Sequence, residues 1–287
     1  MKNEIAVVST LYPSVQPYVG DLVSSLKAQT IKDFDWVVIN DGADEVGLLN
    51  IVDRKLSTHI LNMRGVPPVE NRWLAIRWCK ENGYRYVIFQ DSDDWMTESR
   101  IERSVEAMSQ AGIVFCDLTL VSEEGRVLKE NIWSERFRQS ALIDYNFIAD
   151  KNCIGLGNAA LDLTVVRGDI KTLPGIVAVD WFLFYQVIQN TQACYIENSV
   201  FYRQYRNNLA GRPLLSRESI GRCLEVKQKH YLSLLPMFSV LKDYILKIED
   251  FTERIYKNET KLEEYINKYI SNSSTAFWWE ESNYNYE

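Results

Sequence analysis

The sequence has few of the residues that build zinc centres or disulfide frameworks. Among 287 residues there are two histidines, which form no H-x-x-x-H pair, and five cysteines with no C-x-x-C pair. Thiols scattered in this way are typical of buried core residues in a reducing compartment. We therefore expect neither a structural zinc site nor disulfides, and a cytoplasmic protein.

A basic excess and a long apolar run are also missing. The formal net charge is -7, which argues against nucleic acid as the main partner, because a phosphate backbone needs a basic surface. No run of about 18 apolar residues is present, and the first residues do not look like a signal peptide. With 46% hydrophobic and 25% charged residues, the composition is that of a globular protein.

Apolar runs of strand length alternate with patterns of helical periodicity in the first half of the chain. The expected strands cover 5–10, 36–39, 59–61, 86–89 and 113–120, and the expected helices cover 17–29, 44–56, 69–81 and 98–111. Such alternation predicts an α/β fold with a mostly parallel sheet and right-handed crossovers. A hairpin turn is expected at 123–126.

The second half is less regular and changes character at residue 216. We expect strands over 161–167, 193–196 and 200–205, a tight turn over 152–158 and a helix over 177–188. Ser216 and Ser219 open a helix that extends to about 235, and a second helix follows from 240 to about 269. These changes predict two domains, 1–215 and 216–287, the second being a helical extension with an aromatic tail.

The aromatic tail, which includes Trp278 and Trp279, has two interpretations. One is a tail docked on the protein body, since termini become ordered when they are tied down. The other is a peripheral contact with a membrane at its inner face, because Trp and Tyr prefer that interface. The glutamates near the tail weaken the membrane interpretation.

Carboxylates follow two of the expected strands. Asp91 and Asp93 come after the strand at 86–89, and Asp41 comes after the strand at 36–39. In open α/β sheets ligands bind beyond the carboxyl ends of strands, so these acids could share one cleft. Two carboxylates there suit a hard cation that holds nucleotide phosphates. The alternative is that they only cap a helix near Thr97.

Asp180 is the single acid at the start of a strongly apolar helix. It could be an N-cap, which is common for Asp. It could also be a carboxylate held beside apolar walls, where desolvation raises the pKa and makes a usable base. The residues alone leave both interpretations open.

Several of these segments occur in the order found in a known family. Ser9-Thr10 and Tyr12 stand at the first strand and loop, 25–42 contains S-x-x-x-Q-T and V-V-I-N-D-G, 62–72 contains N-x-R-G and N-R, 89–94 reads F-Q-D-S-D-D, and 179–180 reads V-D. Together they resemble the family 2 glycosyltransferases, which are inverting enzymes with the GT-A (nucleotide-diphospho-sugar transferase) fold. That fold is a Rossmann-like mixed sheet flanked by helices.

The resemblance implies a role for each matching residue. On the donor side, Asp41 would bind the nucleotide base, Thr10 and Tyr12 would line its pocket, and Asp91 would contact the ribose or the metal. Asp93 would be the main ligand of Mn²⁺ or Mg²⁺, and Asp180 would deprotonate the acceptor. Three arginines complete the donor-binding set: Arg72, Arg203 and Arg206. Arg203 and Arg206 would bind the diphosphate.

The resemblance also implies the partners. The donor would be a nucleotide sugar, with a UDP-sugar favoured, and the acceptor a hydroxyl of a glycan or a lipid-linked sugar in bacterial surface polysaccharide synthesis. Asn40 and Val179 depart from the family pattern, in which acids stand at these positions. The motif of processive synthases is absent, which favours transfer of a single sugar.

Two other functions remain as alternatives. A nucleotidyltransferase that makes a nucleotide sugar would share the sheet and the acidic site, but usually needs a Gly-rich basic loop after the first strand, which 11–15 do not supply. A non-catalytic protein that binds sugar nucleotides or glycans would have lost some of the acids.

Overall fold

The structure is a computed structural model that describes residues 3–45, 47, 56–205, 215–272 and 277–282. The helix predicted over 44–56 falls mostly outside these residues, and so does Arg206. The described chain forms two compact units. Unit 1 comprises 1–145, 154–174 and 183–205, and unit 2 comprises 146–153, 175–182 and 206–287. These units differ from the predicted boundary after 215, because two short inner segments group with the C-terminal helices.

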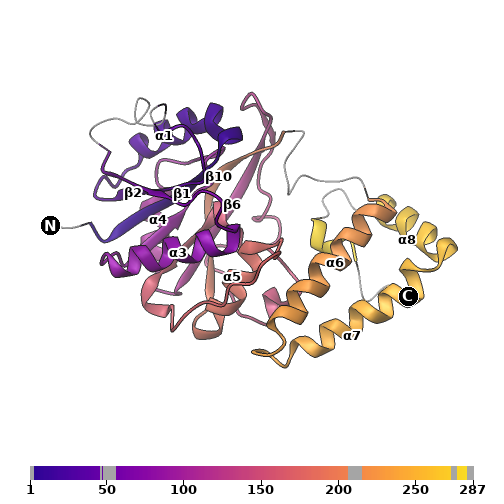
Figure 1. The fold of residues 1–287 in the computed structure, drawn as a ribbon. Coiled ribbons are helices and arrows are strands. Elements are labelled where there is room, and N and C mark those ends of the chain that lie inside the picture. The colour runs from indigo at the N-terminus through magenta and orange to yellow at the C-terminus, as the bar shows by residue number, and fades with distance from the viewer. Residues whose placement is uncertain (1–2, 46, 48–55, 206–214, 273–276, 283–287) are drawn as a thin grey trace. The chain divides into compact units, whose positions relative to one another are not determined.

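Unit 1 is built on one mixed sheet (Figure 1). Its path runs β3-β2-β1-β4-β9-β6-β10-β5, with β7 beside β6 and β8 beside β10. Strands β3, β2, β1 and β4 run parallel to one another, and β10 runs parallel to β6. Strand β9, between β4 and β6, is antiparallel to both. The strands are β1 Ile5–Leu11, β2 Asp35–Asn40, β3 Thr58–Asn62, β4 Tyr86–Phe89, β5 Trp95–Met96, β6 Ile113–Val121, β7 Val127–Lys129, β8 Leu142–Ile143, β9 Ala159–Asp162 and β10 Ala193–Arg203.

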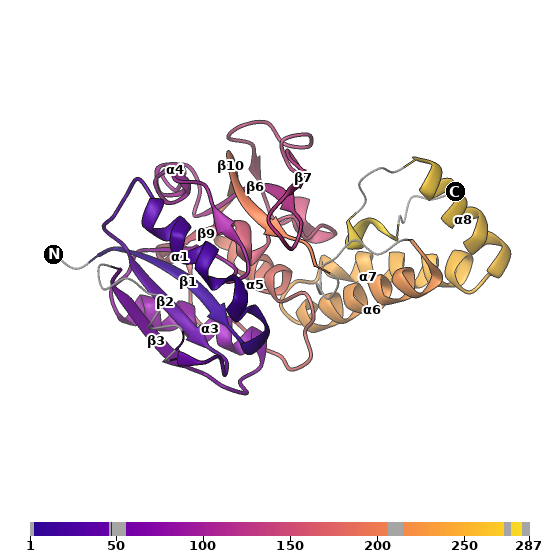
Figure 2. The ribbon, with the colours of Figure 1, turned by 90° about the horizontal axis from the view of Figure 1, so that it is seen from above.

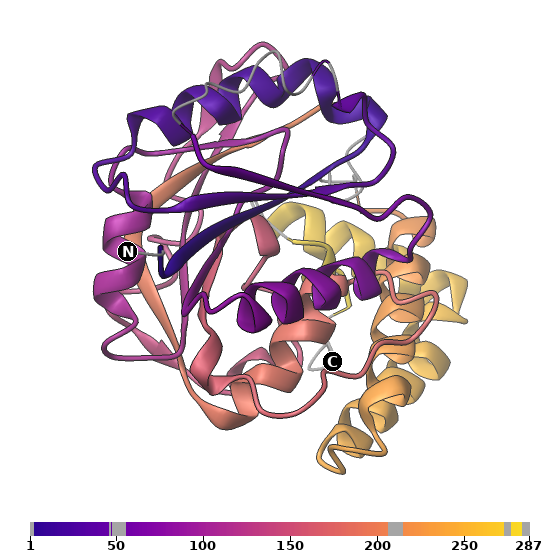
Figure 3. The same ribbon diagram turned by 60° about the vertical axis from the view of Figure 1, so that its left-hand side comes forward.

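Helices cover both faces of this sheet. Figure 3 shows α1 (Val19–Ala28) on one side of β1 and β2, and α3 (Pro68–Glu81) on the other. The alternation of side chains along a strand sends Val7 of β1 towards α1, where it packs in one core with Leu22 and with Ile101 of α4 (Arg100–Ala107). Because β1, β2 and β4 are apolar on both faces, they can be covered on both faces.

Unit 2 is helical. It contains η2 (Phe147–Ala149), the start of α5 (Val179–Val187), α6 (Arg217–Leu234), α7 (Leu241–Phe251), a π-helical turn η6 (Thr252–Tyr256), α8 (Glu259–Asn272) and η7 (Trp278–Glu280). The predicted start of α6 is confirmed, since Ser216 and Ser219 form a reciprocal capping box. Helices α6 and α7 pack side by side (Figure 2).

Several predicted boundaries were wrong. The helix predicted over 240–269 is two helices interrupted at 252–258, where the π-helical turn breaks the i to i−4 pattern. The strand predicted over 161–167 ends at Asp162 and continues as a 3-10 turn. The strands predicted over 193–196 and 200–205 are one strand with a register shift, and the residue that precedes α4 as its N-cap is Ser99, not Thr97.

The aromatic tail packs within unit 2, as the docked interpretation predicts. Trp279 is buried, Trp278 lies 6.1 Å from Trp181 in an edge-on contact, and the Tyr265 hydroxyl donates to the carbonyl of Glu281. In the described part of the chain, no helix combines the length and the apolar character needed to cross a bilayer.

Candidate active site

Three neighbouring parallel strands of unit 1 end at the same edge of the sheet. In the register, Leu11 of β1 pairs with Asn40 of β2, and Val8 of β1 pairs with Phe89 of β4. The Asp41 N–H continues this ladder by donating to the Leu11 carbonyl at 2.7 Å. Thr10, Asp41 and Asp91 are therefore brought together at adjacent strand ends, as the sequence predicts.

The Asp91–Asp94 turn is tied to β1. The Ser92 hydroxyl is buried and donates to the Thr10 carbonyl at 2.6 Å, and the Asp94 N–H closes the turn on the Asp91 carbonyl at 3.3 Å. These bonds fix the backbone of the acidic turn against the first strand.

Asp91 lies against Gly157, which belongs to the 3-10 turn η3 (Leu156–Asn158). A Cβ placed on Gly157 would come within 2.5 Å of Asp91 Oδ2, so only glycine leaves room for this carboxylate. The turn predicted near the site is thus confirmed as a neighbour of Asp91. Asn158 anchors the turn by donating to the Cys116 carbonyl at 2.8 Å.

Asp93 is paired with a tyrosine that the sequence did not suggest. The Tyr205 hydroxyl donates to Asp93 Oδ2 at 2.8 Å. Burial and the negative charge of Asp93 raise the pKa of Tyr205 well above its usual range, so this hydroxyl keeps its proton and remains a donor.

Tyr12 shows how closely the predicted donor-site residues are grouped. Its pKa is raised to about 12, first by burial and then by the charges of Asp93 and Asp91, while the charge of Arg72 acts in the opposite direction. All four side chains therefore lie within electrostatic reach of one another. The donor-binding role of these residues stays a prediction.

Asp94 is the buried member of the acidic turn. Burial, followed by the charges of Asp93 and Asp91, raises its pKa well above the ordinary range, and its Oδ1 accepts from the Arg203 N–H at 2.7 Å. Its Oδ2 is buried with no hydrogen-bond partner among the described residues.

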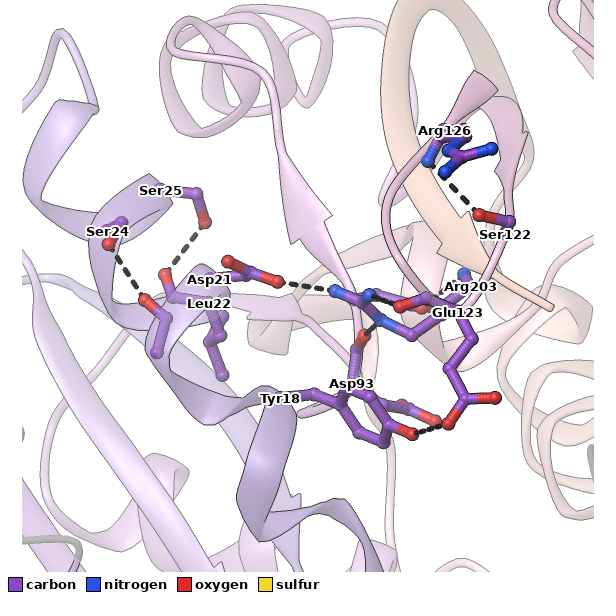
Figure 4. Close-up of polar contacts among 12 residues, drawn as sticks. Tyr18, Asp21, Leu22, Ser24, Ser25, Asp93, Ser122, Glu123, Arg126 and Arg203 are labelled. Carbon is purple, nitrogen blue, oxygen red and sulfur yellow. Dashed lines mark hydrogen bonds and ion pairs between the residues drawn. The ribbon is translucent and has the colours of Figure 1, made fainter. Parts of the chain in front are cut away.

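Arg203 holds three segments of unit 1 together (Figure 4). Its guanidinium donates to the Asp93 carbonyl at 2.9 Å and to the Glu123 carbonyl, and it forms an ion pair with Asp21 of α1 at 2.5 Å. The side chain is only 3% exposed. These contacts link α1, the acidic turn and the β6–β7 hairpin, so they favour a structural role over the diphosphate contact that we predicted.

Aromatic rings enclose the Arg203 guanidinium. Its central carbon lies 4.7 Å from the Tyr18 ring centre and 5.0 Å from the Trp95 ring centre, within the range of cation–π contacts. Tyr18 in turn stacks on Tyr205 at 5.7 Å. The ring that caps Asp93 is therefore supported by the same cluster.

Asp41 and Asn40 differ in what they contact. Asp41 Oδ1 accepts the Gly65 N–H at 3.0 Å, whereas the Asn40 amide donates to Asn62 Oδ1 on β3 at 2.9 Å. Asn40 therefore serves as a donor to β3, a role that a carboxylate at this position could not take. Asp41 remains partly exposed beside this pair.

Asp180 belongs to unit 2. It lies in the first turn of α5, one residue inside the helix start, and is therefore not the N-cap. Its Oδ1 accepts from the Asn152 amide at 3.1 Å and from the Trp181 N–H at 2.8 Å. Both bonds hold the same carboxylate oxygen and so restrain the orientation of the side chain.

No cluster of three or more His, Cys, Asp or Glu side chains suited to a metal ion occurs among the described residues. All five cysteines are buried. Any cation at the acidic turn would therefore need oxygen ligands from a bound molecule or from water in addition to the carboxylates.

Sequence comparison places the chain in a family. Residues 6–160, more than half of the chain, match the profile of glycosyl transferase family 2, and the chain belongs to that family. A glycosyltransferase of Rickettsia bellii (strain RML369-C), described as uncharacterized, is 25% identical over 130 residues. That match covers 44% of this chain and 18% of the relative, so the chain spans less than a fifth of the relative's length.

Solved structures share the fold. S. aureus TarS 1-349 in complex with UDP-GlcNAc has a TM-score of 0.63 at 17% identity, with 91% of this chain and 77% of that chain covered. The mannosyltransferase PcManGT from Pyrobaculum calidifontis, in complex with GDP-Man and Mn²⁺, has a TM-score of 0.59 at 12% identity, with coverages of 96% and 77%. The predicted GT-A fold is thereby confirmed.

Proposed function

We propose that the protein is an inverting glycosyltransferase that moves one sugar from a nucleotide-sugar donor to a hydroxyl acceptor. The observation that carries this proposal is the electrostatic grouping of Tyr12, Asp91, Asp93 and Arg72 at the strand ends of unit 1. Solved structures with the same fold contain UDP-GlcNAc or GDP-Man. A nucleoside diphosphate is recognised by aromatic rings and by charged groups for its phosphates, and this edge carries the ring of Tyr12 and the charge of Arg72.

The donor would bind at this edge of unit 1. We assign the base to Asp41 and Thr10, with Tyr12 as the flanking ring, and the ribose to Asp91. Arg72, whose charge lowers the pKa of Tyr12, would face the diphosphate. Arg206 keeps its predicted diphosphate role as a proposal, whereas Arg203 is assigned to the support of the acidic turn. A UDP-sugar remains the favoured donor.

The acidic turn fits Mn²⁺ or Mg²⁺. Asp91 and Asp93 would hold the ion, because hard cations of this kind bind one or two carboxylates together with substrate phosphates and water. Burial and then the charges of Asp93 and Asp91 raise the pKa of Asp94, and a cation at the turn would offset those two charges. When bound, the ion would stabilise charge on the departing diphosphate.

Asp180 is our candidate for the general base. It would take the proton from the acceptor hydroxyl, whose oxygen then forms the bond to the anomeric carbon as the bond to the nucleoside diphosphate breaks. Attack from the face opposite to the leaving group inverts the configuration at that carbon. The two donors to its Oδ1 would orient the carboxylate for this step.

The acceptor is the least constrained partner. We propose a glycan or lipid-linked sugar in surface polysaccharide synthesis, handled in the cytoplasm, where buried thiols stay reduced. A peripheral membrane contact stays a prediction. The aromatic tail that suggested it packs within unit 2 through Trp279.

The test is release of nucleoside diphosphate from UDP-GlcNAc, UDP-glucose and GDP-mannose in the presence of Mn²⁺, with water as the acceptor. We expect Asp93→Ala and Asp180→Asn each to lower turnover by at least about 100-fold. Two exposed acids give matched controls, Asp33→Ala in unit 1 and Asp243→Asn in unit 2. Both control variants should retain wild-type turnover. Equal turnover in Asp93→Ala and wild type would contradict the assignment.

The same assay separates the two alternative functions. A nucleotidyltransferase would release pyrophosphate from a nucleoside triphosphate and a sugar phosphate, and a non-catalytic protein would bind the donor without turnover. No observation at the strand ends favours either of them over transfer.

A further inference from the structure

The start of α5 is packed into the helical part of unit 2 by one large side chain. Trp181, next to Asp180 in the chain, is 1% exposed. Its ring lies 3.7 Å from the His230 ring of α6 at an interplanar angle of 9°, which is a close parallel stack. The edges of Tyr231 and Trp278 lie against the same ring at 5.6 Å and 6.1 Å.

Two hydrogen bonds lock this arrangement in place. The Trp181 ring N–H donates to the Ile148 carbonyl at 2.7 Å, so the ring cannot rotate without losing a buried bond. Four residues further along the same segment, Asn152 donates to Asp180 Oδ1 at 3.1 Å. The segment 146–153 thus holds both Trp181 and the carboxylate beside it.

Helix α6 also contacts the residues that precede α5 in the chain. Lys229 lies directly against Gly175, where any Cβ would collide with its ammonium group. Gly175 also has φ +75, which an L side chain rarely adopts. Both ends of the segment 175–182 are therefore fitted to α6, at Lys229 and at His230.

We propose that α6 and the segment 146–153 are a positioning device for Asp180, with His230 and Asn152 as the positioning residues. His230 acts through Trp181, and Asn152 acts directly on the carboxylate. The proposal rests on the role of Asp180 as the base. It gives a function to the helices beyond residue 216, which lie outside the region that matches the family profile.

The chemistry explains why such a device matters. A general base works only when its oxygen is held within hydrogen-bond reach of the proton it removes, and a misplacement of about 1 Å can cost about 100-fold in rate. One carboxylate oxygen that is fixed by two donors leaves the group a single orientation. The ring stack fixes the backbone from which that carboxylate projects.

The test compares His230→Ala, which removes the stack, with His230→Phe, which keeps a flat ring. Phe251→Ala is the matched control, because Phe251 is equally buried in unit 2 and packs edge-on against Tyr265 of α8. Amide hydrogen exchange is measured over 175–183 by mass spectrometry. We expect about tenfold faster exchange there in His230→Ala only, with His230→Phe close to wild type.

The second readout is turnover with water as the acceptor and GDP-mannose or UDP-GlcNAc as the donor. His230→Ala should lower kcat about tenfold with the donor KM within about twofold, and His230→Phe should restore most of it. If His230→Ala does not fold, Asn152→Leu is the substitute, because it removes the hydrogen bond to Asp180 while keeping a side chain of similar volume. It should also lower kcat while leaving the donor KM nearly unchanged.

Unchanged exchange in His230→Ala overturns the proposal, and so does an equal loss of kcat in Phe251→Ala. A wild-type protein that releases no nucleoside diphosphate from any donor overturns the proposed function instead. In that case the exchange experiment still decides whether α6 orders the segment around Asp180.

Discussion

The Tyr205 hydroxyl donates a hydrogen bond to Asp93 Oδ2 at 2.8 Å, on the very carboxylate that we assign to the metal. A donor on this oxygen and a cation compete for the same lone pairs. A divalent ion held by Asp93 would therefore share this carboxylate with the Tyr205 hydroxyl.

Tyr205→Phe should bind Mn²⁺ more tightly, by about threefold to tenfold, because one hydrogen bond of about 1 kcal/mol no longer opposes binding. The measurement is a Mn²⁺ titration followed by electron paramagnetic resonance, with UDP present. Tyr18→Phe is the control, since Tyr18 stacks on Tyr205 but donates to Glu123. Weaker Mn²⁺ binding in Tyr205→Phe would show that the hydroxyl supports the ion instead of competing with it.

Arg203→Ala should lower the free energy of unfolding by about 2–4 kcal/mol. The change removes bonds to the Asp93 and Glu123 carbonyls and the pair with Asp21, and it leaves a void beside Tyr18 and Trp95. Urea unfolding measures this.

The matched control for Arg203 is Arg126→Ala, an exposed arginine in the same region of Figure 4, which should cost less than about 0.5 kcal/mol. If Arg203→Ala kept wild-type stability and lost only diphosphate affinity, the phosphate-binding role predicted from the sequence would be restored.

Gly157→Ala should weaken binding of the nucleoside diphosphate with Mn²⁺ by at least about tenfold. The new methyl would stand 2.5 Å from Asp91 Oδ2 and force this carboxylate to move. Calorimetric titration of UDP with and without Mn²⁺ gives the affinities. Gly20→Ala in α1 is the control, because nothing lies within 4 Å of its added methyl; a matching loss of affinity in that variant would remove the steric explanation.

His230 makes stability depend on pH. Burial lowers the pKa of His230 from 6.5 to about 3, so between these values the unfolded chain binds a proton that the folded chain does not. The free energy of unfolding must then fall as the pH falls below 6.5, by at most about 1.4 kcal/mol per pH unit from this group.

His230→Phe removes that contribution, so the variant should gain stability relative to wild type between pH 6.5 and pH 4. Urea unfolding at pH 7, 6, 5 and 4 checks the expectation. Parallel pH profiles of the two proteins would mean that His230 is not held neutral by burial.

Local sequence patterns predicted much of the fold. The capping box of Ser216 and Ser219 and the apolar runs of β1, β2 and β4 each depend on residues close together in the chain. Motif order was enough to identify the family, and the strand ends gave the grouping of Asp41 with Asp91.

Features that depend on distant partners were not predictable in this way. Arg203 contacts Asp21, 182 positions away, and Tyr205 meets Asp93 across 112 positions. From the sequence, an arginine beside a predicted loop suggests phosphate binding. Only the structure reveals that Arg203 donates to the carbonyls of Asp93 and Glu123. The break at Thr252–Tyr256 was missed because its apolar spacing continues through the turn.

The most direct test of the central claim is the thermal unfolding midpoint measured with UDP, GDP, ADP and CDP, each with and without Mn²⁺. At a ligand concentration about 100 times Kd, binding to the folded state adds about 2.7 kcal/mol, or about 5 °C for a chain of this size. We predict such a rise for one diphosphate only when Mn²⁺ is present, and its loss in Asp93→Ala. An unchanged midpoint with all four diphosphates, or a rise that Asp93→Ala retains, would contradict a donor site at Asp91 and Asp93.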